Sequence, residues 1–215
     1  MDGVLFDSMK NHAAAWHEAM QLYGMTLSPE EAYLHEGRTG ASTINIVSLR
    51  ERGHEATEAE IKEIYQTKSD IFSRLAKPER MPGAYEVLLK IKQEGLIPMV
   101  VTGSGQKSLL DKLNHHFPDI FKPELMVTAF DVKYGKPNPE PYLMALRKAG
   151  IQPNEAIVVE NAPLGVRAGV AAGIFTVAVN TGPLPDKTLL DEGADLLFSS
   201  MPAFNEAWET FYSEL

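Results

Sequence analysis

Residues 156–169 read Ala-Ile-Val-Val-Glu-Asn-Ala-Pro-Leu-Gly-Val-Arg-Ala-Gly, an apolar run followed at once by helical spacing. The apolar run predicts a strand over 156–159, and Pro163 suits the first turn of a following helix. Glu160 and Asn161 stand between the two elements. In an open α/β sheet this position lies at the carboxyl edge of the strands, where ligands bind. The stretch therefore predicts an α/β fold with a polar site at that edge.

The same pattern recurs over the C-terminal two thirds of the chain. Further apolar runs predict strands at 97–101, 125–128 and 175–179. Helical spacing fills the intervals at 85–94, 106–116, 139–149 and 164–172, and a glycine follows three of these segments. This alternation predicts a doubly wound, Rossmann-like parallel sheet.

The segment 8–77 has a different character, because it is rich in Glu, Ala, Met and Gln and carries apolar residues at i, i+3 and i+4. It contains no convincing strand pattern. We therefore expect a small, all-helical cap over 8–77, inserted into a core made of residues 1–7 and 78–215.

Bulk properties narrow the function classes. The 215 residues suit one core with a small insertion, and the net charge of −9 argues against a nucleic-acid surface. The chain has no cysteine, which excludes disulfides and thiolate chemistry. No apolar run reaches the roughly 20 residues of a membrane span, and the first residues lack the features of a signal peptide. We expect a cytoplasmic monomer that binds neither nucleic acid nor membranes.

Two further stretches predict a phosphate site. Residues 98–105 end an apolar run with Thr102, Gly103 and Ser104, and hydroxyl and backbone N–H groups before a helix make a neutral phosphate cradle. Residues 134–140 place Lys136 before Pro-Asn-Pro-Glu, where a fixed cation can offset charge beside a phosphoryl group. Acidic and amide oxygens at Glu160 and Asn161 are of the hard type that Mg²⁺ prefers.

The first eight residues, Met-Asp-Gly-Val-Leu-Phe-Asp-Ser, complete a set of four ordered motifs. Together these motifs resemble those of the haloacid dehalogenase (HAD) superfamily. The resemblance implies that Asp2 is the acid–base residue, that Thr102 and Lys136 complete the catalytic group, and that Asp2, Glu160 and Asn161 hold Mg²⁺. The family usually has a second carboxylate where this chain has Asn161, so that ligand brings no charge.

The resemblance also implies an attacking aspartate two positions before Asp2. We therefore expect a short apolar strand ending in that aspartate ahead of Met1, lying centrally in the sheet. If Met1 is instead the true start, the chain is an inactive phosphate-binding pseudoenzyme.

The spacing of His12 and Trp16 behind the first motif resembles the β-phosphoglucomutase branch of the superfamily. Mutases of that branch carry Lys-Gly-x-x-Arg in the cap, whereas this chain has Glu36 and Gly40 at the two basic positions. A carboxylate facing a sugar phosphate is repulsive unless a cation intervenes. Much of the chain, including residues 35–42, 102–106, 130–142 and 160–165, closely resembles a HAD-type inorganic pyrophosphatase of this branch. The leading prediction is therefore a Mg²⁺-dependent phosphohydrolase acting on pyrophosphate, and the alternative is a sugar-phosphate mutase. The leading prediction assigns substrate binding to His12, Glu36, Arg38, Gly103 and Ser104.

Overall fold

The computed structural model describes residues 1–75, 77–103 and 109–214. Four helices fill the segment predicted as a cap: α1 Met9–Leu22, α2 Pro29–Leu34, α3 Gly40–Arg52 and α4 Glu58–Arg74. Side-chain caps start three of them, and Thr57 forms a capping box with Glu60 at the start of α4. The described residues of 8–77 contain no strand. Where the cap ends and the core begins stays a prediction.

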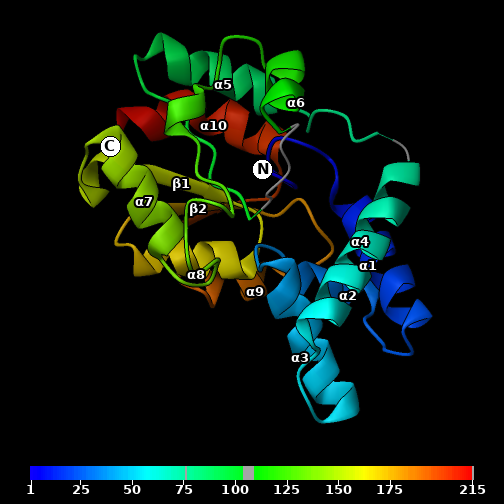
Figure 1. The fold of residues 1–215 in the computed structure, drawn as a ribbon. Coiled ribbons are helices and arrows are strands. Elements are labelled where there is room, and N and C mark those ends of the chain that lie inside the picture. The colour runs from blue at the N-terminus through cyan, green and yellow to red at the C-terminus, as the bar shows by residue number, and fades with distance from the viewer. Residues whose placement is uncertain (76, 104–108, 215) are drawn as a thin grey trace.

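The cap helices enclose an apolar cluster of their own. Its fully buried members include Met20, Leu27, Ile44, Val47 and Ile64. Figure 1 shows these four helices to one side of the sheet, joined to the rest of the fold near the N-terminus. The apolar faces of the four helices therefore pack against one another within the cap. The outer surface of the cap is then available to contact the core.

The core is a parallel α/β structure, as the sequence predicts. Strands β1 Ile157–Glu160, β2 Phe175–Val179 and β3 Leu196–Phe198 pair in that order, with Val159 opposite Val177 and Val177 opposite Leu196. Two helical layers cover the sheet, and Figure 1 shows them on opposite faces. One layer contains α5 Ala84–Gln93, α6 Leu109–His116 and α10 Met201–Ser213; the other contains α7 Glu140–Ala149, α8 Pro163–Ala171 and α9 Asp186–Leu190. Short 3₁₀ turns at Pro123–Leu125 and Pro153–Glu155 complete the elements.

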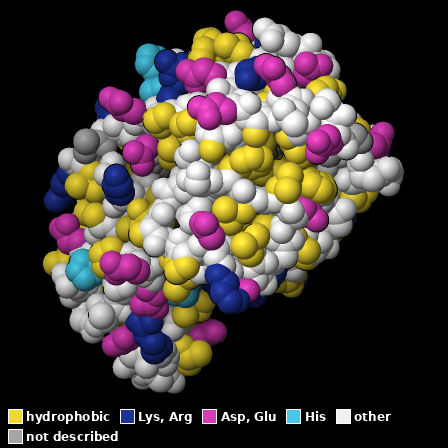
Figure 2. Space-filling view, turned by 180° about the vertical axis from the view of Figure 1, so that it is seen from behind, with side chains coloured by type: hydrophobic (Ala, Val, Ile, Leu, Met, Phe, Trp, Pro, Cys, Tyr) yellow, Lys and Arg dark blue, Asp and Glu magenta, His cyan; other side chains and the backbone are white. Residues whose placement is uncertain are grey.

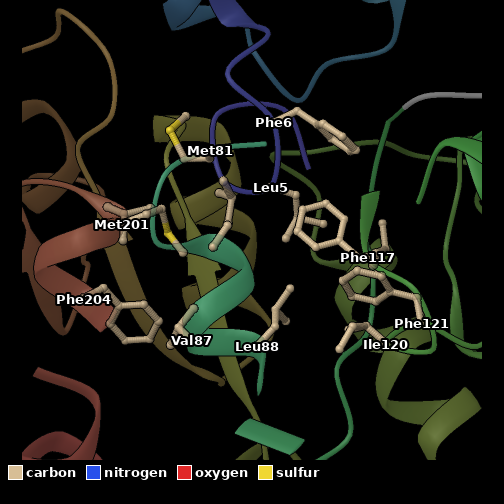
Figure 3. Close-up of a cluster of buried hydrophobic side chains, with 14 of the residues drawn as sticks. Leu5, Phe6, Met81, Val87, Leu88, Phe117, Ile120, Phe121, Met201 and Phe204 are labelled. Atoms are coloured by element: carbon tan, nitrogen blue, oxygen red, sulfur yellow. The ribbon is translucent and has the colours of Figure 1, made fainter. Parts of the chain in front are cut away.

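The first loop is anchored in the main apolar core. Phe6 is fully buried and packs edge-on against Phe117 with ring centroids 5.5 Å apart. Figure 3 shows Leu5 and Phe6 beside α5 and near Phe117, with Phe204 of α10 in the same cluster. Residues 1–7 are therefore held by burial of their apolar side chains, which fixes the position of Asp2 within the same loop.

The region predicted as a strand over 97–101 differs from expectation. Only Val101 pairs, through an isolated parallel bridge to Val127, and the predicted strand over 125–128 is likewise reduced to that bridge. A cavity of about 430 Å³, lined by Val101 and Val159 among others, lies between this segment and β1. Without a hydrogen-bonded neighbour along its length, an apolar segment does not form a regular strand. The sequence also missed β3 and α10.

The surface is mixed in character. Figure 2 shows acidic side chains scattered among apolar ones over the face turned away from the view of Figure 1. Among the described residues, no helix combines the length and apolar character that a membrane crossing needs. The monomeric state and the cytoplasmic location stay predictions.

Candidate active site

A buried ion pair joins two of the predicted motifs. Lys136 precedes α7 and Glu160 ends β1, and both side chains are 7% exposed. Lys136 Nζ donates to Glu160 Oε1 and also to the carbonyl of Val101 at 3.3 Å, while the hydroxyl of Tyr142 donates to Glu160 Oε1 at 2.5 Å. Burial by itself would raise the pKa of Glu160, but the charge of Lys136, the N-terminal ammonium and the hydrogen bonds from Lys136 and Tyr142 together outweigh burial and lower the pKa. Glu160 is therefore held as a carboxylate.

The first loop meets the loop that follows β1. Gly3 has φ +73°, and a Cβ built there would lie 1.9 Å from Asn161 Nδ2. The side chain of Asn161 thus rests directly on the backbone beside Asp2, at a place that only glycine leaves open. On its other side, the Gly3 carbonyl accepts a hydrogen bond of 2.6 Å from the hydroxyl of Thr181. These contacts fix the position of Asp2 relative to Glu160 and Asn161.

Asp2 is held by donors from the start of the cap. Its Oδ1 accepts from the hydroxyl of Ser8 at 2.5 Å and lies 3.3 Å from His12 Nε2. Burial opposes the charge of Asp2, but the hydrogen bond and charge of His12, the N-terminal ammonium and the hydrogen bond from Ser8 together outweigh burial and lower its pKa. We infer an ionised Asp2 at neutral pH, which suits a base better than an acid.

His12 is oriented in turn by Lys68 of α4. Lys68 Nζ lies 2.8 Å from His12 Nδ1, so His12 accepts there and carries its proton on Nε2, toward Asp2. The His12 ring also stacks on Phe72, with centroids 4.2 Å apart. Burial lowers the pKa of His12, and burial lowers the pKa of Lys68 to about 8. The chain Lys68, His12, Asp2 thus connects a cap helix to the predicted acid–base residue.

The cap loop after α2 reaches into the same site. Glu36 Oε2 accepts a hydrogen bond of 3.0 Å from Asn161 Nδ2. A Cβ at Gly37 would lie 3.1 Å from Lys136 Cδ, and one at Gly103 would lie 3.2 Å from the carbonyl oxygen of Gly37. Burial raises the pKa of Glu36 well above its usual value, and the nearby charges of Glu160 and Asp2 add to this effect. The cap loop therefore lies in direct contact with the core loops.

The donor set fits a divalent cation. Asn161 is 7% exposed, and its Oδ1 is buried with no hydrogen-bond partner in the described part of the chain. Asp2 and Glu160 lie close enough to Glu36 that the negative charge of each disfavours ionisation of the Glu36 carboxyl group. A hard cation would take the free amide oxygen and relieve this repulsion. Among the described residues, no three His, Cys, Asp or Glu side chains are arranged so that they could hold a metal ion together. The buried amide oxygen of Asn161 is the additional ligand that favours the fit.

The remaining predicted residues lie around this centre. Thr102 is 8% exposed, and its N–H donates to the carbonyl of Val127 at 2.9 Å, one residue beyond the bridge at Val101. Gly103 contacts the cap loop as described above. Arg38 lines a cleft beside Lys133 and Lys136. Ser104 lies outside the described residues, so its role in substrate binding stays a prediction.

This arrangement of loops matches a known family. Residues 1–179 match the family model described as haloacid dehalogenase-like hydrolase. The chain belongs to the haloacid dehalogenase-like hydrolase family. Hexitol phosphatase A of Escherichia coli is 33% identical to this HAD-family chain, and the match covers 84% of this chain and 80% of the relative. The phosphorylated carbohydrates phosphatase of Thermotoga maritima is 30% identical over 90% of this chain and 89% of the relative.

A solved structure supports the predicted branch of the HAD superfamily. The structure, from Bacteroides vulgatus and described as a candidate β-phosphoglucomutase, is 73% identical and has a TM-score of 0.97. It is matched over 100% of this chain and 87% of its own. The HAD assignment and the β-phosphoglucomutase-like branch are thereby confirmed. The finer resemblance to a pyrophosphatase stays a prediction, because the names of these relatives refer to carbohydrate phosphates or to a mutase.

Sequence reasoning missed several residues that build this HAD-family site. Ser8 stands within the first motif, and its polar side chain at the end of an apolar run was a local signal. Tyr142, Lys68 and Thr181 carried no such signal, because each reaches its partner across a long stretch of sequence: 18, 56 and 178 residues, respectively.

Proposed function

We propose that this HAD-family chain is a Mg²⁺-dependent hydrolase of inorganic pyrophosphate. The observation that carries the proposal is the hydrogen bond of 3.0 Å between Glu36 of the cap and Asn161 of the core. In the proposal, Glu36 is the carboxylate on the leaving-group side of the site, at the position where the sugar-phosphate mutases of the branch have a lysine. Gly37 of the same loop lies close to Lys136, because a Cβ built at Gly37 would be 3.1 Å from Lys136 Cδ. This closeness of the cap loop to Lys136 favours a small leaving group such as phosphate over a sugar.

The charge state of Asp2 gives independent support. A sugar leaves as a strongly basic alkoxide and needs a proton from a general acid, whereas phosphate leaves as a stable anion. Burial opposes ionisation of Asp2, but His12, the N-terminal ammonium and Ser8 together lower its pKa, so at neutral pH Asp2 is a poor proton donor. An ionised Asp2 remains well suited to accept a proton from the water that completes hydrolysis. The pair Asp2 and His12 therefore favours a substrate that requires little acid assistance.

The other residues have matching roles in the proposal. The hydroxyl of Thr102 and the N–H of Gly103 bind phosphoryl oxygens, together with Ser104. Lys136 supplies a fixed positive charge between Glu160 and the phosphoryl group. Bound Mg²⁺ would neutralise charge between the phosphoryl oxygens and the carboxylates, held by Glu160, the Asn161 amide oxygen and Asp2. The family resemblance assigns the attack on phosphorus to an aspartate two positions before Asp2.

The test is a steady-state assay of the complete gene product with Mg²⁺. We expect hydrolysis of pyrophosphate to exceed that of hexose and hexitol phosphates. Glu36→Ala should lower kcat/KM for pyrophosphate at least roughly tenfold more than for a small phosphoester such as p-nitrophenyl phosphate, because it alters only the leaving-group side. Glu30→Ala removes an exposed carboxylate from the same cap and serves as the control. Equal losses on both substrates would show that Glu36 has a structural role only.

Two other activities have specific support and form the competing outcomes. The names of the Escherichia coli and Thermotoga maritima relatives favour a phosphatase of small carbohydrate phosphates. The description of the Bacteroides vulgatus structure favours a mutase, although Glu36 and Gly40 replace both cap cations of the mutase signature. Preference for hexitol phosphates over pyrophosphate, or efficient interconversion of glucose 1- and 6-phosphates, would refute the pyrophosphatase proposal.

A further inference from the structure

A cleft of about 530 Å³ lies between the cap and the loop before α7. The cap contributes Arg38, Thr39 and Ser42 to its lining, and the core contributes residues 133–139. The lining includes the three basic residues Arg38, Lys133 and Lys136 and no acidic residue. This local excess of positive charge stands out in a chain with a net charge of −9.

Arg38 has hydrogen-bonding capacity that the protein does not use. Its Nε is buried and has no hydrogen-bond partner among the described residues. A guanidinium carries five N–H donors and no acceptor, and withdrawing such donors from water without a partner is costly. Arg167 of α8 does not relieve this cost, because it is a second cation near Arg38 and is itself paired with Glu192. Arg38 is therefore poised for an acceptor from outside the chain.

Two side-chain acceptors of the cleft lining are already engaged. Thr39 Oγ1 accepts from the N–H of Ser42 at 3.2 Å, and Asn138 Oδ1 accepts from the N–H of Glu140 at 2.9 Å. The donors of the lining include the Arg38 guanidinium and the Lys133 ammonium, which lies 4.9 Å from the centroid of the Tyr134 ring. Donor excess combined with positive charge is the chemistry that recognises a tetrahedral oxyanion.

We propose that this cleft binds a small phosphate-type oxyanion, held by Arg38 from the cap and Lys133 from the core. The site is separate from the cradle at Thr102 and Gly103, although Lys136 lies between the two. An anion bound here links cap to core by attraction to both. It has two sources under the proposed function: phosphate released by hydrolysis, or the outer phosphoryl group of a longer polyphosphate.

Crystals of the complete gene product grown with tungstate locate the site directly, because tungstate resembles phosphate and scatters anomalously. We expect an anomalous peak in the cleft, in contact with Arg38 and Lys133. The peak should be lost in Arg38→Ala/Lys133→Ala and retained in Lys122→Ala/Arg147→Ala, which removes the same charge from exposed positions outside the cleft. Lys133→Ala alone, at an exposed position, serves if the double variant does not fold. A peak only at Thr102 and Lys136, or no peak, overturns the proposal.

Kinetics with Lys133→Ala separate the two sources. If released phosphate occupies the cleft, inhibition by inorganic phosphate should weaken roughly fivefold with an unchanged KM for pyrophosphate, as expected for loss of one exposed ion pair. If an outer phosphoryl group occupies it, KM should rise for tripolyphosphate and stay unchanged for pyrophosphate. A tungstate peak in the cleft of a protein that does not hydrolyse pyrophosphate would uphold this site and refute the proposed function. Pyrophosphate hydrolysis without that peak would do the reverse.

Discussion

Replacing Lys136 with methionine tests the energetics on which the site depends. The change keeps the length and apolar stem of the side chain and removes only the ammonium group. Glu160 would then stay 5% exposed, with the hydroxyl of Tyr142 and the N–H of Asn161 as its remaining donors. The variant therefore isolates the cost of leaving a buried carboxylate without its cation.

The expected loss of stability is large. Removing one partner of a buried ion pair costs about 3–5 kcal/mol, because the other charge remains in the interior. Since Glu160 keeps two hydrogen-bond donors, we expect the lower end, about 3 kcal/mol at pH 7. For a chain of this size, that loss lowers the Tm by roughly 6–12 °C.

The loss should depend on pH in a definite direction. In the unaltered chain the pKa of Glu160 lies below its ordinary value of 4.5, so the pair contributes stability above that value and loses it as the pH falls through the lowered pKa. Without Lys136, burial dominates and raises the pKa of Glu160 above its ordinary value. The carboxyl group then takes up a proton on mild acidification and its unpaired charge disappears. The difference between Lys136→Met and the unaltered chain should therefore be greatest at pH 7 and shrink toward pH 5.

Urea denaturation followed by circular dichroism at pH 5, 6 and 7 measures this difference. Lys133→Met, in the same loop but at an exposed position, is the matched control and should change stability by less than about 0.5 kcal/mol. Lys136→Met/Glu160→Gln completes a double-mutant cycle and should recover part of the loss. A loss below about 1 kcal/mol at pH 7, or one that does not vary with pH, would refute a charged, buried Glu160 held by Lys136.

Three further expectations can be measured on the same preparations. Gly3→Ala should cost about 1–2 kcal/mol more than Gly24→Ala in urea denaturation, because both glycines have φ near +70° but only the Cβ at Gly3 meets Asn161; equal costs would exclude the close contact. Between pH 8 and 10 the unaltered chain should gain about 1–2 kcal/mol of stability relative to Lys68→Met. In the folded chain the pKa of Lys68 is about 8, so over this range the unfolded chain binds more protons than the folded one and stability rises with pH. Parallel pH profiles of the two chains would contradict this. Asn161→Leu should weaken Mg²⁺ binding at least roughly tenfold in calorimetry, because it removes an oxygen ligand without filling its place; unchanged binding would remove Asn161 from the ligand set.

The sequence identified those features of the site that depend on neighbouring residues. Apolar runs that end in polar residues predicted β1 and β2, and Pro163 marked the start of α8, because strand and helix periodicity and turn chemistry are local properties. The position of Glu160 after an apolar run and that of Lys136 before Pro-Asn-Pro-Glu predicted that both would lie at one edge of the sheet. The sequence alone also showed that Glu36 replaces the lysine of the mutase signature.

Tertiary structure decided how these residues are paired and charged. Only the folded chain brings Lys68 to His12 and Glu36 to Asn161, because these pairs are separated by 56 and 125 residues and no local pattern encodes their contact. The lowered pKa of Asp2 follows from hydrogen bonds and positive charges that outweigh burial, and the raised pKa of Glu36 follows from burial and neighbouring carboxylates. These surroundings exist only after the cap has packed on the core. Tertiary structure also decided the form of segment 97–101. Its apolar sequence favours a strand, but a strand requires a hydrogen-bonded neighbour along its length, and in the fold only Val101 of this segment pairs.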